Sequence, residues 1–395
     1  MKIRLGVIFG GPSVEHEVSI ISAVQAMKSL NLEKYDIIPI YVTKNREWYT
    51  GEALRDIETY SDIELLKRCT TNVILYAKDG KFFLQSTGFF KRIKAEIDMM
   101  FPVVHGTNME DGVLQGYLQT IGIPFVGSDV YASTIGQDKV LQKLVYESKG
   151  LPVAPYFWFY DVDYLNNEDE IIKECKKIKF PLIVKPATLG SSVGIKVVND
   201  ETELRNAIED AILYDKKILV EHVVSNLVEV NISVLGNYKL QETSLIEEVT
   251  TDNSMLTYED KYINGGKKSG KTGPSKGMAS LNRKIPADIS DKMAFEVKDI
   301  AIKAFKAIGS SGVARIDFLI DKKNKQVYIN EINSCPGSLA FYLWEPNNKK
   351  YSELLDDIIK IGIKDYQMRM KKVNSFDSNI LEGFNGVKGS KGRKF

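Results

Sequence analysis

Two acids and one amide in two strand-like segments, with an arginine beside them, have the types and spacing needed to hold a divalent cation. Arg315 and Asp317 stand two apart in the first segment, and Glu331 and Asn333 stand two apart in the second. Residues two apart in a strand share one face. Turn-forming residues at 321–325 predict a β-hairpin that places Asp317 opposite Glu331. Two carboxylates and an amide oxygen beside a cation match the ligands that Mg²⁺ prefers when it carries nucleotide phosphates. The alternative is a hairpin with a solvated polar face.

A second segment suited to chemistry is the glycine- and serine-rich stretch that follows Lys185. The apolar run Phe180–Lys185 predicts a strand, and Gly190, Ser191 and Ser192 follow it in a loop. Glycine lets backbone amides approach an anion closely, and serine hydroxyls add further donors. The loop lacks the Gly-Lys-Ser/Thr of a Walker A motif. It therefore predicts either a phosphate cradle of another kind or an ordinary Gly-Ser turn.

Length and composition describe a globular chain of more than one domain. Its 395 residues favour two or three domains, and its 44% hydrophobic and 27% charged content is typical of such proteins. A net charge of +1 does not produce the strong electrostatic field that would attract nucleic acid or a membrane surface. No apolar run approaches the ~20 residues of a membrane span. The pattern of the first nine residues predicts a buried strand and not a signal peptide. Cys69, Cys175 and Cys335 are too few for a disulfide framework. We expect a cytoplasmic protein without nucleic-acid or membrane partners.

The first 130 residues alternate strand and helix patterns. Strands are predicted at Ile3–Phe9, Tyr35–Tyr41 and Met99–Val104, with a helix at 18–30 after the first. This alternation favours a parallel α/β sheet. Such sheets bind ligands at the carboxyl ends of their strands, so 10–19 and the stretch from His105 are expected at a cleft.

The sequence after residue 130 predicts two further domains and a C-terminal tail. A helix is expected over 132–150, carrying Asp138 and Lys139, and strands and helices of a small α+β unit continue to 222. Strands from 228, helices at 288–308 and 351–370 and the hairpin make the last unit. The predicted domains are 1–130, 131–227 and 228–372, and the polar tail 373–395 is expected to be disordered.

Six motifs in order resemble those of the D-alanine–D-alanine ligase family, within the ATP-grasp superfamily. They are Phe9–Ser19, His105–Gly112, Lys185–Gly194, Tyr258–Tyr262, Arg315–Asp317, and Asn330–Asn333 with Pro336 and Gly337. The resemblance spans residues 3 to about 370. It implies an ATP-grasp fold of three domains: an N-terminal parallel α/β sheet, a small central α+β subdomain and a C-terminal α+β domain with an antiparallel sheet.

The activity that the resemblance implies is ligation of two D-alanines to D-alanyl-D-alanine for peptidoglycan precursors. ATP is consumed, and an acyl phosphate forms on the first alanine. The implied ions are two Mg²⁺, with Mn²⁺ as a substitute and K⁺ as an additional candidate. A homodimer is the implied assembly.

Site residues carry over from the matched motifs as expectations. The implied metal ligands are Asp317, Glu331 and Asn333. The ATP-binding residues implied are Lys139, Lys185, Ser191, Ser192, Glu221, Val223, Glu229 and Lys261.

On the amino-acid side, the resemblance implies a triad of Glu15, Ser191 and Tyr262, in which Glu15 holds the first ammonium group. Arg315 and the Gly337 amide are implied to stabilise the tetrahedral oxyanion. The remaining substrate-binding residues are His105, beside the first carboxylate, and Glu110, Tyr342 and Leu343.

The chain departs from the family pattern at the second amino-acid subsite. Tyr342 stands where the pattern usually has a small hydroxyl residue, and Leu189 replaces a residue that is often polar. The stretch 261–284 is longer than usual and is interpreted as a lid over the γ-phosphate, with a flexible linker or a basic nucleic-acid loop as alternatives.

The alternative activities are D-alanine–D-serine or D-alanine–D-lactate ligation, or another ATP-grasp peptide ligation. Tyr262 argues against D-lactate, because relatives that form the ester replace that tyrosine. A nucleotide-binding regulator without chemistry would be expected to lack the metal ligands or Arg315. A carboxylase or carboxylate–thiol ligase would lack the motifs around Glu15 and His105.

Overall fold

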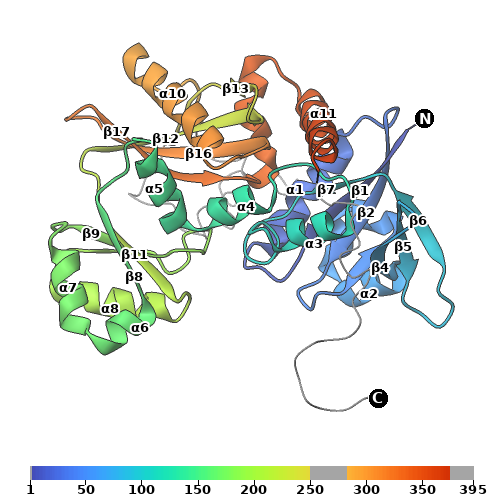
Figure 1. Ribbon diagram of the computed structural model, residues 1–395, viewed down its shortest axis with the longest axis horizontal. Helices are drawn as coiled ribbons and strands as arrows, with labels where there is room; N and C mark the ends of the chain where they lie inside the picture. Colours follow the sequence, from blue (N-terminus) through green and yellow to red (C-terminus); the bar gives the residue numbers. More distant parts are fainter. Residues whose placement is uncertain (1, 250–282, 374–395) are drawn as a thin grey trace, which may run out of the picture.

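The computed structural model describes residues 2–249 and 283–373, which form three β-sheets with helices packed on them (Figure 1). Most of the stretch 261–284, including Lys261 and Tyr262, and nearly all of the tail 373–395 lie outside the described residues. Within the described ranges, no helix is long and apolar enough to cross a membrane.

The N-terminal sheet is mixed, with strand order β6-β5-β4-β3-β2-β1-β7. Its parallel part consists of β1 (Ile3–Gly10), β2 (Tyr35–Val42) and β7 (Met99–Pro102). The sheet continues with antiparallel strands: β3 (Trp48–Thr50), β4 (Thr71–Lys78), β5 (Lys81–Ser86) and β6 (Ile93–Ile97). The predicted parallel arrangement thus holds only for the half of the sheet next to the cleft, because residues 43–98 form an antiparallel extension.

Helices cover both faces of this sheet. On one face, α1 (His16–Ser29) and α11 (Tyr351–Met370) share a core cluster with β1, and that cluster also contains Trp344. On the other face lies α3 (Val113–Ile121), whose Leu114 and Leu118 are buried. A short helix, α2 (Ile63–Cys69), precedes β4. Because the first cluster contains residues from both ends of the chain, the N- and C-terminal parts pack as neighbours.

A helix predicted as continuous over 132–150 is broken in two. The structure has α4 (Val130–Gln137) and α5 (Lys139–Ser148), separated at Asp138, which adopts an extended conformation. The Asp138 carboxylate accepts hydrogen bonds from the backbone amides of Val140 and Leu141 (2.9 and 3.1 Å). Aspartate is a favoured N-cap because it satisfies such amides. The break therefore starts a new helix at Lys139.

The central sheet is small and antiparallel, with order β10-β9-β11-β8. Its strands are β8 (Tyr156–Tyr160), β9 (Leu182–Pro186), β10 (Lys196–Val198) and β11 (Lys217–His222). Its helices are α6 (Asp161–Asn166), α7 (Glu168–Lys176) and α8 (Glu201–Ile212). Buried residues of α7 and α8 pack against β9 and β11, forming a separate core. This unit occupies the lower left of Figure 1.

The C-terminal sheet has the order β15-β14-β12-β16-β17, with β13 also paired to β12. Its strands are β12 (Leu227–Gly236), β13 (Gln241–Thr243), β14 (Glu247–Val249), β15 (Arg283–Lys284), β16 (Gly312–Asp321) and β17 (Gln326–Asn333). The long helix α10 (Asp291–Ala307) packs on one face, together with Tyr146 of α5. The helix α5 thus belongs to this core, although it precedes the central sheet in sequence.

Candidate active site

The predicted hairpin is formed by β16 and β17, with the expected register. Asp317 pairs with Glu331, and Arg315 pairs with Asn333. A β-bulge follows Asp317, because Phe318 already pairs with Ile329. Bulges redirect side chains and are common beside active sites. The Asp317 carboxylate accepts two hydrogen bonds of 2.7 Å from the Arg315 guanidinium.

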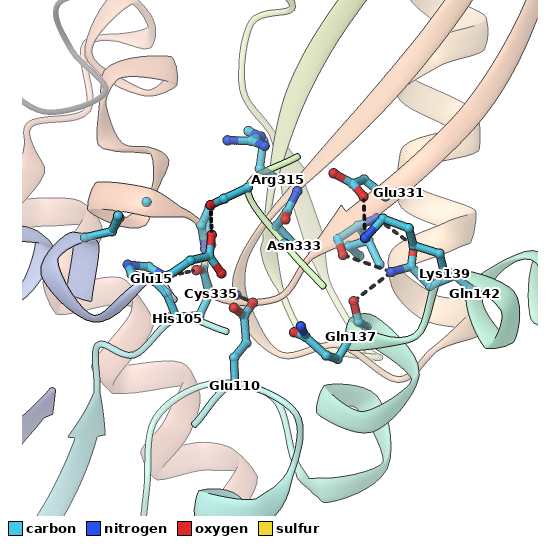
Figure 2. A pocket seen from close by; sticks show the side chains of 17 residues that line it. Glu15, His105, Glu110, Gln137, Lys139, Gln142, Arg315, Glu331, Asn333 and Cys335 are labelled. Atoms are coloured by element: carbon cyan, nitrogen blue, oxygen red, sulfur yellow. Dashed lines mark hydrogen bonds and ion pairs between the residues drawn. The ribbon is translucent and has the colours of Figure 1, made fainter. Parts of the chain in front are cut away.

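A cavity opens beside this hairpin, between it, the N-terminal sheet and α4–α5 (Figure 2). Nine residues expected at the site line it: Glu15, His105, Glu110, Lys139, Ser191, Arg315, Glu331, Asn333 and Gly337. They come from segments that are far apart in sequence. The cavity is thus where five of the six sequence motifs meet; the sixth, Tyr258–Tyr262, lies outside the described residues.

The charged groups of the cavity are paired across it. Lys139 lies 3.4 Å from Glu331 and donates a 2.7 Å hydrogen bond to the carbonyl of Leu189. Burial disfavours the charge on Arg315, yet Asp317 holds its pKa well above the ordinary value. Each carboxylate of the hairpin therefore has a cation beside it.

Asp317, Glu331 and Asn333 form a donor set that fits a divalent cation. The Asn333 amide lies 3.4 Å from the Asp317 carboxylate, and Glu331 stands opposite Asp317 in register. Within residues 2–249 and 283–373, no three His, Cys, Asp or Glu side chains gather as a metal cage. The fit therefore rests on two carboxylates and one amide oxygen, which suit Mg²⁺ when phosphates complete the coordination.

Behind the cavity lies a buried charge cluster centred on Glu221. Its carboxylate forms ion pairs with Lys143 and Lys185. Burial alone would raise the pKa of Glu221, but the two ammonium groups lower it to about 2. Lys185 also lies 3.4 Å from the side-chain oxygen of Asn330, in the β-bulge. Lys185 thus links the central sheet to the β16–β17 hairpin.

The glycine- and serine-rich loop reaches the N-terminal sheet through Glu15. The Ser191 hydroxyl donates to the Glu15 carboxylate, and a Cβ atom added at Gly190 would lie 2.7 Å from Glu15 Oε2. Ser191 and Ser192 both have positive φ (56° and 61°), a turn conformation that directs successive amides to one side. The loop therefore has the backbone shape of an anion cradle and closes against a carboxylate.

The residues around His105 form a polar wall of the cavity. His105 contacts the carbonyl of Cys335 through Nδ1 (2.8 Å) and the hydroxyl of Ser22 through Nε2 (3.0 Å). Burial lowers the pKa of His105. The Glu110 carboxylate accepts from the Cys335 amide (3.0 Å), and burial together with the charge of Glu15 raises its pKa to about 8. His105 is consequently neutral at pH 7, and Glu110 is largely protonated.

A left-handed turn follows Gly337. Ser338, Leu339 and Ala340 all have φ of 51–52°, a conformation that costs an L-residue about 1–2 kcal/mol each. Ser338 is held by α1, because its amide donates to Ser22 (2.9 Å) and its hydroxyl to Gln25 (2.7 Å). The turn is thus strained and externally anchored.

Not every expected site residue lines the cavity. Leu343 is fully buried in the core cluster shared with α1 and does not line the cavity. Tyr342 is 7% exposed and lies near Arg315 without lining the cavity. The other described residues do not line the cavity either. Asp317 lies on the hairpin, Lys185 on β9 and Ser192 in the glycine- and serine-rich loop. Glu221 lies on β11, Glu229 on β12, and Val223 between these two strands.

Sequence reasoning missed Lys143, Arg283 and Ser22. Lys143 follows Lys139 by four residues, which puts both on one face of α5, but this spacing alone does not indicate that Lys143 is buried. Arg283 stacks on Tyr342, and Ser22 joins His105 to Ser338. No local pattern marks these two, because their partners are distant in sequence.

Two family models match the chain. The description "D-ala D-ala ligase N-terminus" matches residues 4–128, and "D-ala D-ala ligase C-terminus" matches residues 145–360. A D-alanine–D-alanine ligase of Thermosipho melanesiensis is 37% identical over 381 residues, which is 96% of this chain and 98% of the relative. One from Thermosipho africanus is 38% identical over 382 residues, 96% of this chain and 98% of the relative.

Solved structures agree in fold. The D-alanine–D-alanine ligase from Coxiella burnetii superposes with a TM-score of 0.78 at 29% identity, covering 94% of this chain and 96% of that one. The VanG D-Ala:D-Ser ligase from Enterococcus faecalis gives 0.75 at 29% identity, covering 92% and 100%. The ATP-grasp architecture expected from the motifs is therefore confirmed. With both halves matched and relatives aligned over nearly their whole length, the chain belongs to the D-alanine–D-alanine ligase family.

Proposed function

We propose that this chain joins two D-alanines to D-alanyl-D-alanine with consumption of ATP, supplying peptidoglycan precursors. The observation that carries the proposal is the single cavity at which Glu15, Ser191, Arg315 and Glu331 converge from separate sequence motifs. Its two ends differ in chemistry. Lys139 and Glu331 lie at one end, and Glu15 and His105 lie at the other. A phosphate-handling site thus adjoins an amino-acid site (Figure 2).

At the phosphate end, Lys139 and Lys185 bind ATP phosphates, and the amides of Ser191 and Ser192 cradle them. Glu221 and Val223 lie at the adenine side, and Glu229 accepts from the ribose. Asp317, Glu331 and Asn333 hold Mg²⁺, with two ions and replacement by Mn²⁺ as the finer proposal. When bound, the metal neutralises phosphate charge and orients the transferred group. Lys261 is assigned to ATP from its motif alone, since it lies outside the described residues.

At the amino-acid end, Glu15 binds the ammonium of the first D-alanine and is oriented by the Ser191 hydroxyl. Tyr262 completes this triad by motif, outside the described residues. His105 and Glu110 line the wall where the first carboxylate binds. A neutral His105 and a protonated Glu110 suit that role, since neither repels an incoming carboxylate.

The bond-forming step uses Arg315 and the Gly337 amide. The free amine of the second D-alanine attacks the acyl carbon, and negative charge develops on the former carbonyl oxygen. When this charge returns to the carbon, the bond to the phosphate oxygen breaks, inorganic phosphate leaves, and the new amide nitrogen loses a proton. A permanently charged guanidinium fixed on a strand can stabilise that charge without reorganising. Arg315 is held in place by Asp317 through two hydrogen bonds, so its orientation is set before substrate arrives.

Several finer properties complete the proposal. The proposed domains are residues 1–130, 131–227 and 228–372, with α5 of the second packed against the core of the third, and the proposed assembly is a homodimer. K⁺ is an additional ion beside Mg²⁺. The reaction takes place in the cytoplasm, where ATP is available.

The test is a direct assay of purified protein with ATP, Mg²⁺ and D-alanine. Phosphate release that depends on D-alanine, with the dipeptide identified by mass, is the expected result. Reactions that contain D-alanine together with D-serine or with D-lactate test the two alternative activities. Absence of D-alanine-dependent phosphate release over a wide concentration range would refute the proposal.

A further inference from the structure

The strand that carries two of the expected metal ligands lies at the edge of its sheet. In the part of the chain that the structure describes, β17 is the last strand of the C-terminal sheet, and no further strand pairs with its outer side. The amide of Ile329 donates outward to the carbonyl of Pro152 (2.9 Å). Because the β-bulge shifts the alternation along the strand, the next outward amide is that of Ile332. The outer edge of β17 thus needs a hydrogen-bonding partner at Ile332.

The side-chain amide of Gln142, on α5, meets both backbone groups of Ile332. The Ile332 amide donates to Gln142 Oε1 (2.9 Å), and Gln142 Nε2 donates to the Ile332 carbonyl (3.3 Å). Nε2 also donates to the carbonyl of Gly136 in α4 (2.7 Å). Gln142 is only 2% exposed, so bulk water competes little for these bonds. At this one residue, the side chain takes the place of a neighbouring strand.

These bonds hold the two peptide groups that lie between Glu331 and Asn333. The Ile332 amide belongs to the peptide group after Glu331, and the Ile332 carbonyl belongs to the one before Asn333. Because each peptide group is planar, holding both of them restricts the directions in which the two flanking side chains leave the backbone. The Ile332 side chain points to the opposite face, where it is 1% exposed in the core of the C-terminal sheet. The strand is therefore fixed here by a core side chain and by Gln142.

An amide side chain suits this double contact, because its oxygen accepts and its nitrogen donates. A carboxylate only accepts, and an ammonium group only donates. The place of Gln142 on α5 is also significant, since Lys139 in the same first turn lies 3.4 Å from Glu331. Figure 2 shows Gln142, Lys139 and Glu331 together at one end of the cavity. The start of α5 thus contacts the side chain of one expected ligand and the backbone beside it.

We propose that Gln142 is a positioning residue for the divalent cation, an inference that rests on the proposed function. It acts through the backbone of β17, by holding Glu331 and Asn333 so that their oxygen atoms can bind the ion together with the ATP phosphates. Groups that orient the ligands of a metal raise its affinity, because the ligands need not be ordered when the ion binds. Without the amide of Gln142, the backbone groups of Ile332 lose this partner and the two ligands are held less firmly.

Nucleotide binding with and without Mg²⁺ isolates this role. Isothermal titration calorimetry measures the Kd of AMP-PNP, an ATP analogue that resists hydrolysis, once in Mg²⁺ and once in EDTA. The factor by which Mg²⁺ tightens AMP-PNP binding reports the coupling between the metal and the nucleotide. This factor requires neither D-alanine nor catalysis. Unfolded protein lowers the measured stoichiometry and leaves the factor unchanged.

Gln142→Met keeps the length of the side chain and removes its amide. The factor by which Mg²⁺ tightens AMP-PNP binding should fall about 10- to 100-fold, the usual effect of losing a group that orients a metal ligand. The Kd in EDTA should stay near the wild-type value. In the ligation assay, the Mg²⁺ concentration that gives half the maximal rate should rise, and the KM for D-alanine should change little. Gln142→Asn keeps the amide but is too short for both bonds, and it should shift the factor in the same direction.

Gln115→Met is the matched control. Gln115 is also a buried glutamine that donates to a backbone carbonyl, that of Met109 (3.2 Å), but it lies on α3 in the N-terminal part of the chain. Its substitution removes a buried amide away from the hairpin. The factor by which Mg²⁺ tightens AMP-PNP binding should therefore match that of the wild type.

Two results would overturn the inference. An unchanged factor in Gln142→Met and Gln142→Asn, even with a lowered melting temperature, would mean that Gln142 only stabilises the fold. An equal loss of affinity in Mg²⁺ and in EDTA would mean that it acts on the nucleotide through Lys139 and not on the metal ligands. The wild type tests the function separately: Mg²⁺-dependent AMP-PNP binding without ligation of D-alanine would refute the proposed function and leave the binding test of Gln142 valid.

Discussion

Lys143 and Glu221 form an ion pair in which both side chains are almost fully excluded from solvent, at 1% and 3% exposure. The second oxygen of Glu221 binds Lys185, which is 9% exposed. Glu221 thus has one enclosed partner and one partner next to the proposed nucleotide site. We predict from this asymmetry that Lys143 keeps Glu221 paired when Lys185 contacts an ATP phosphate, the role proposed for Lys185 above.

Lys143→Met should therefore raise the KM for ATP about tenfold or more, because Glu221 would then retain Lys185. Removing one partner of a buried pair also costs roughly 3–5 kcal/mol of stability. Steady-state kinetics and thermal melting measure the two effects. Lys143→Arg keeps the charge and should recover much of the ATP affinity. A KM for ATP that stays at the wild-type value in folded Lys143→Met would contradict this role.

Glu331→Gln should abolish turnover and leave the fold intact. The change removes a negative charge from the proposed metal site but almost no volume. Circular dichroism should match the wild type, and activity should not return at high Mg²⁺. Gln326→Glu, at the exposed start of the same strand, is a control for altered charge on β17. Near-full activity of Glu331→Gln at limiting Mg²⁺ would show that the metal assignment is wrong.

Arg315→Met should lower kcat by about 10²–10³-fold, the usual effect of removing one donor to a developing oxyanion. The KM for ATP should change little. Pre-steady-state measurement of phosphate release separates the chemical step from nucleotide binding. A defect confined to the KM for ATP would instead make Arg315 a nucleotide-binding residue.

Gly190→Ala should impair use of the first D-alanine with little loss of stability. The new methyl group would lie 2.7 Å from Glu15 Oε2, and the flexible end of the Glu15 side chain can move away. That movement disrupts the Ser191–Glu15 contact. The expected result is a higher KM for the first substrate and a melting temperature near that of the wild type. Gly116→Ala, where the added carbon meets nothing within 4 Å, is the matched control.

The raised pKa of Glu110 predicts that the stability of the fold depends on pH. Its pKa is raised from 4.5 to about 8 by burial and by the charge of Glu15, so the folded state favours the protonated carboxyl. The resulting stabilisation is complete below about pH 4.5 and is lost as the pH rises through 8. Relative to Glu110→Gln, the wild type should therefore lose melting temperature across that window. A difference that stays constant from pH 5 to 9 would contradict the raised pKa.

The hairpin was predictable because its signals are local. Alternation and a turn sequence fixed which residues face one another, and Asp317 does pair with Glu331. The glycine- and serine-rich loop was visible for the same reason. The Asp138 break in the helix was missed, although aspartate at that position is a sufficient capping signal. Strands β3 to β6 were missed because they form a half-exposed antiparallel extension without a strong apolar pattern.

Contacts between segments that are far apart in the sequence could not be predicted from local sequence patterns. A single lysine on an amphipathic helix such as α5 reads as an exposed charge, and only the approach of β11 makes Lys143 a buried one. Tyr342 was singled out by its departure from the family pattern. Its partner Arg283 was not, because no spacing relates two residues on separate elements that meet only in the folded chain.

The hydroxyl of Ser22 contacts both His105 and the amide of Ser338, so one atom of α1 joins the His105 wall of the cavity to the strained turn that follows Gly337. This junction therefore needs residues from both the N-terminal and the C-terminal part of the described chain. Chimeras that exchange the N-terminal region between relatives must preserve this three-way junction. Where the donor lacks a hydroxyl at position 22, the left-handed turn loses one of its two hydrogen bonds to α1, so such a chimera is expected to be less stable.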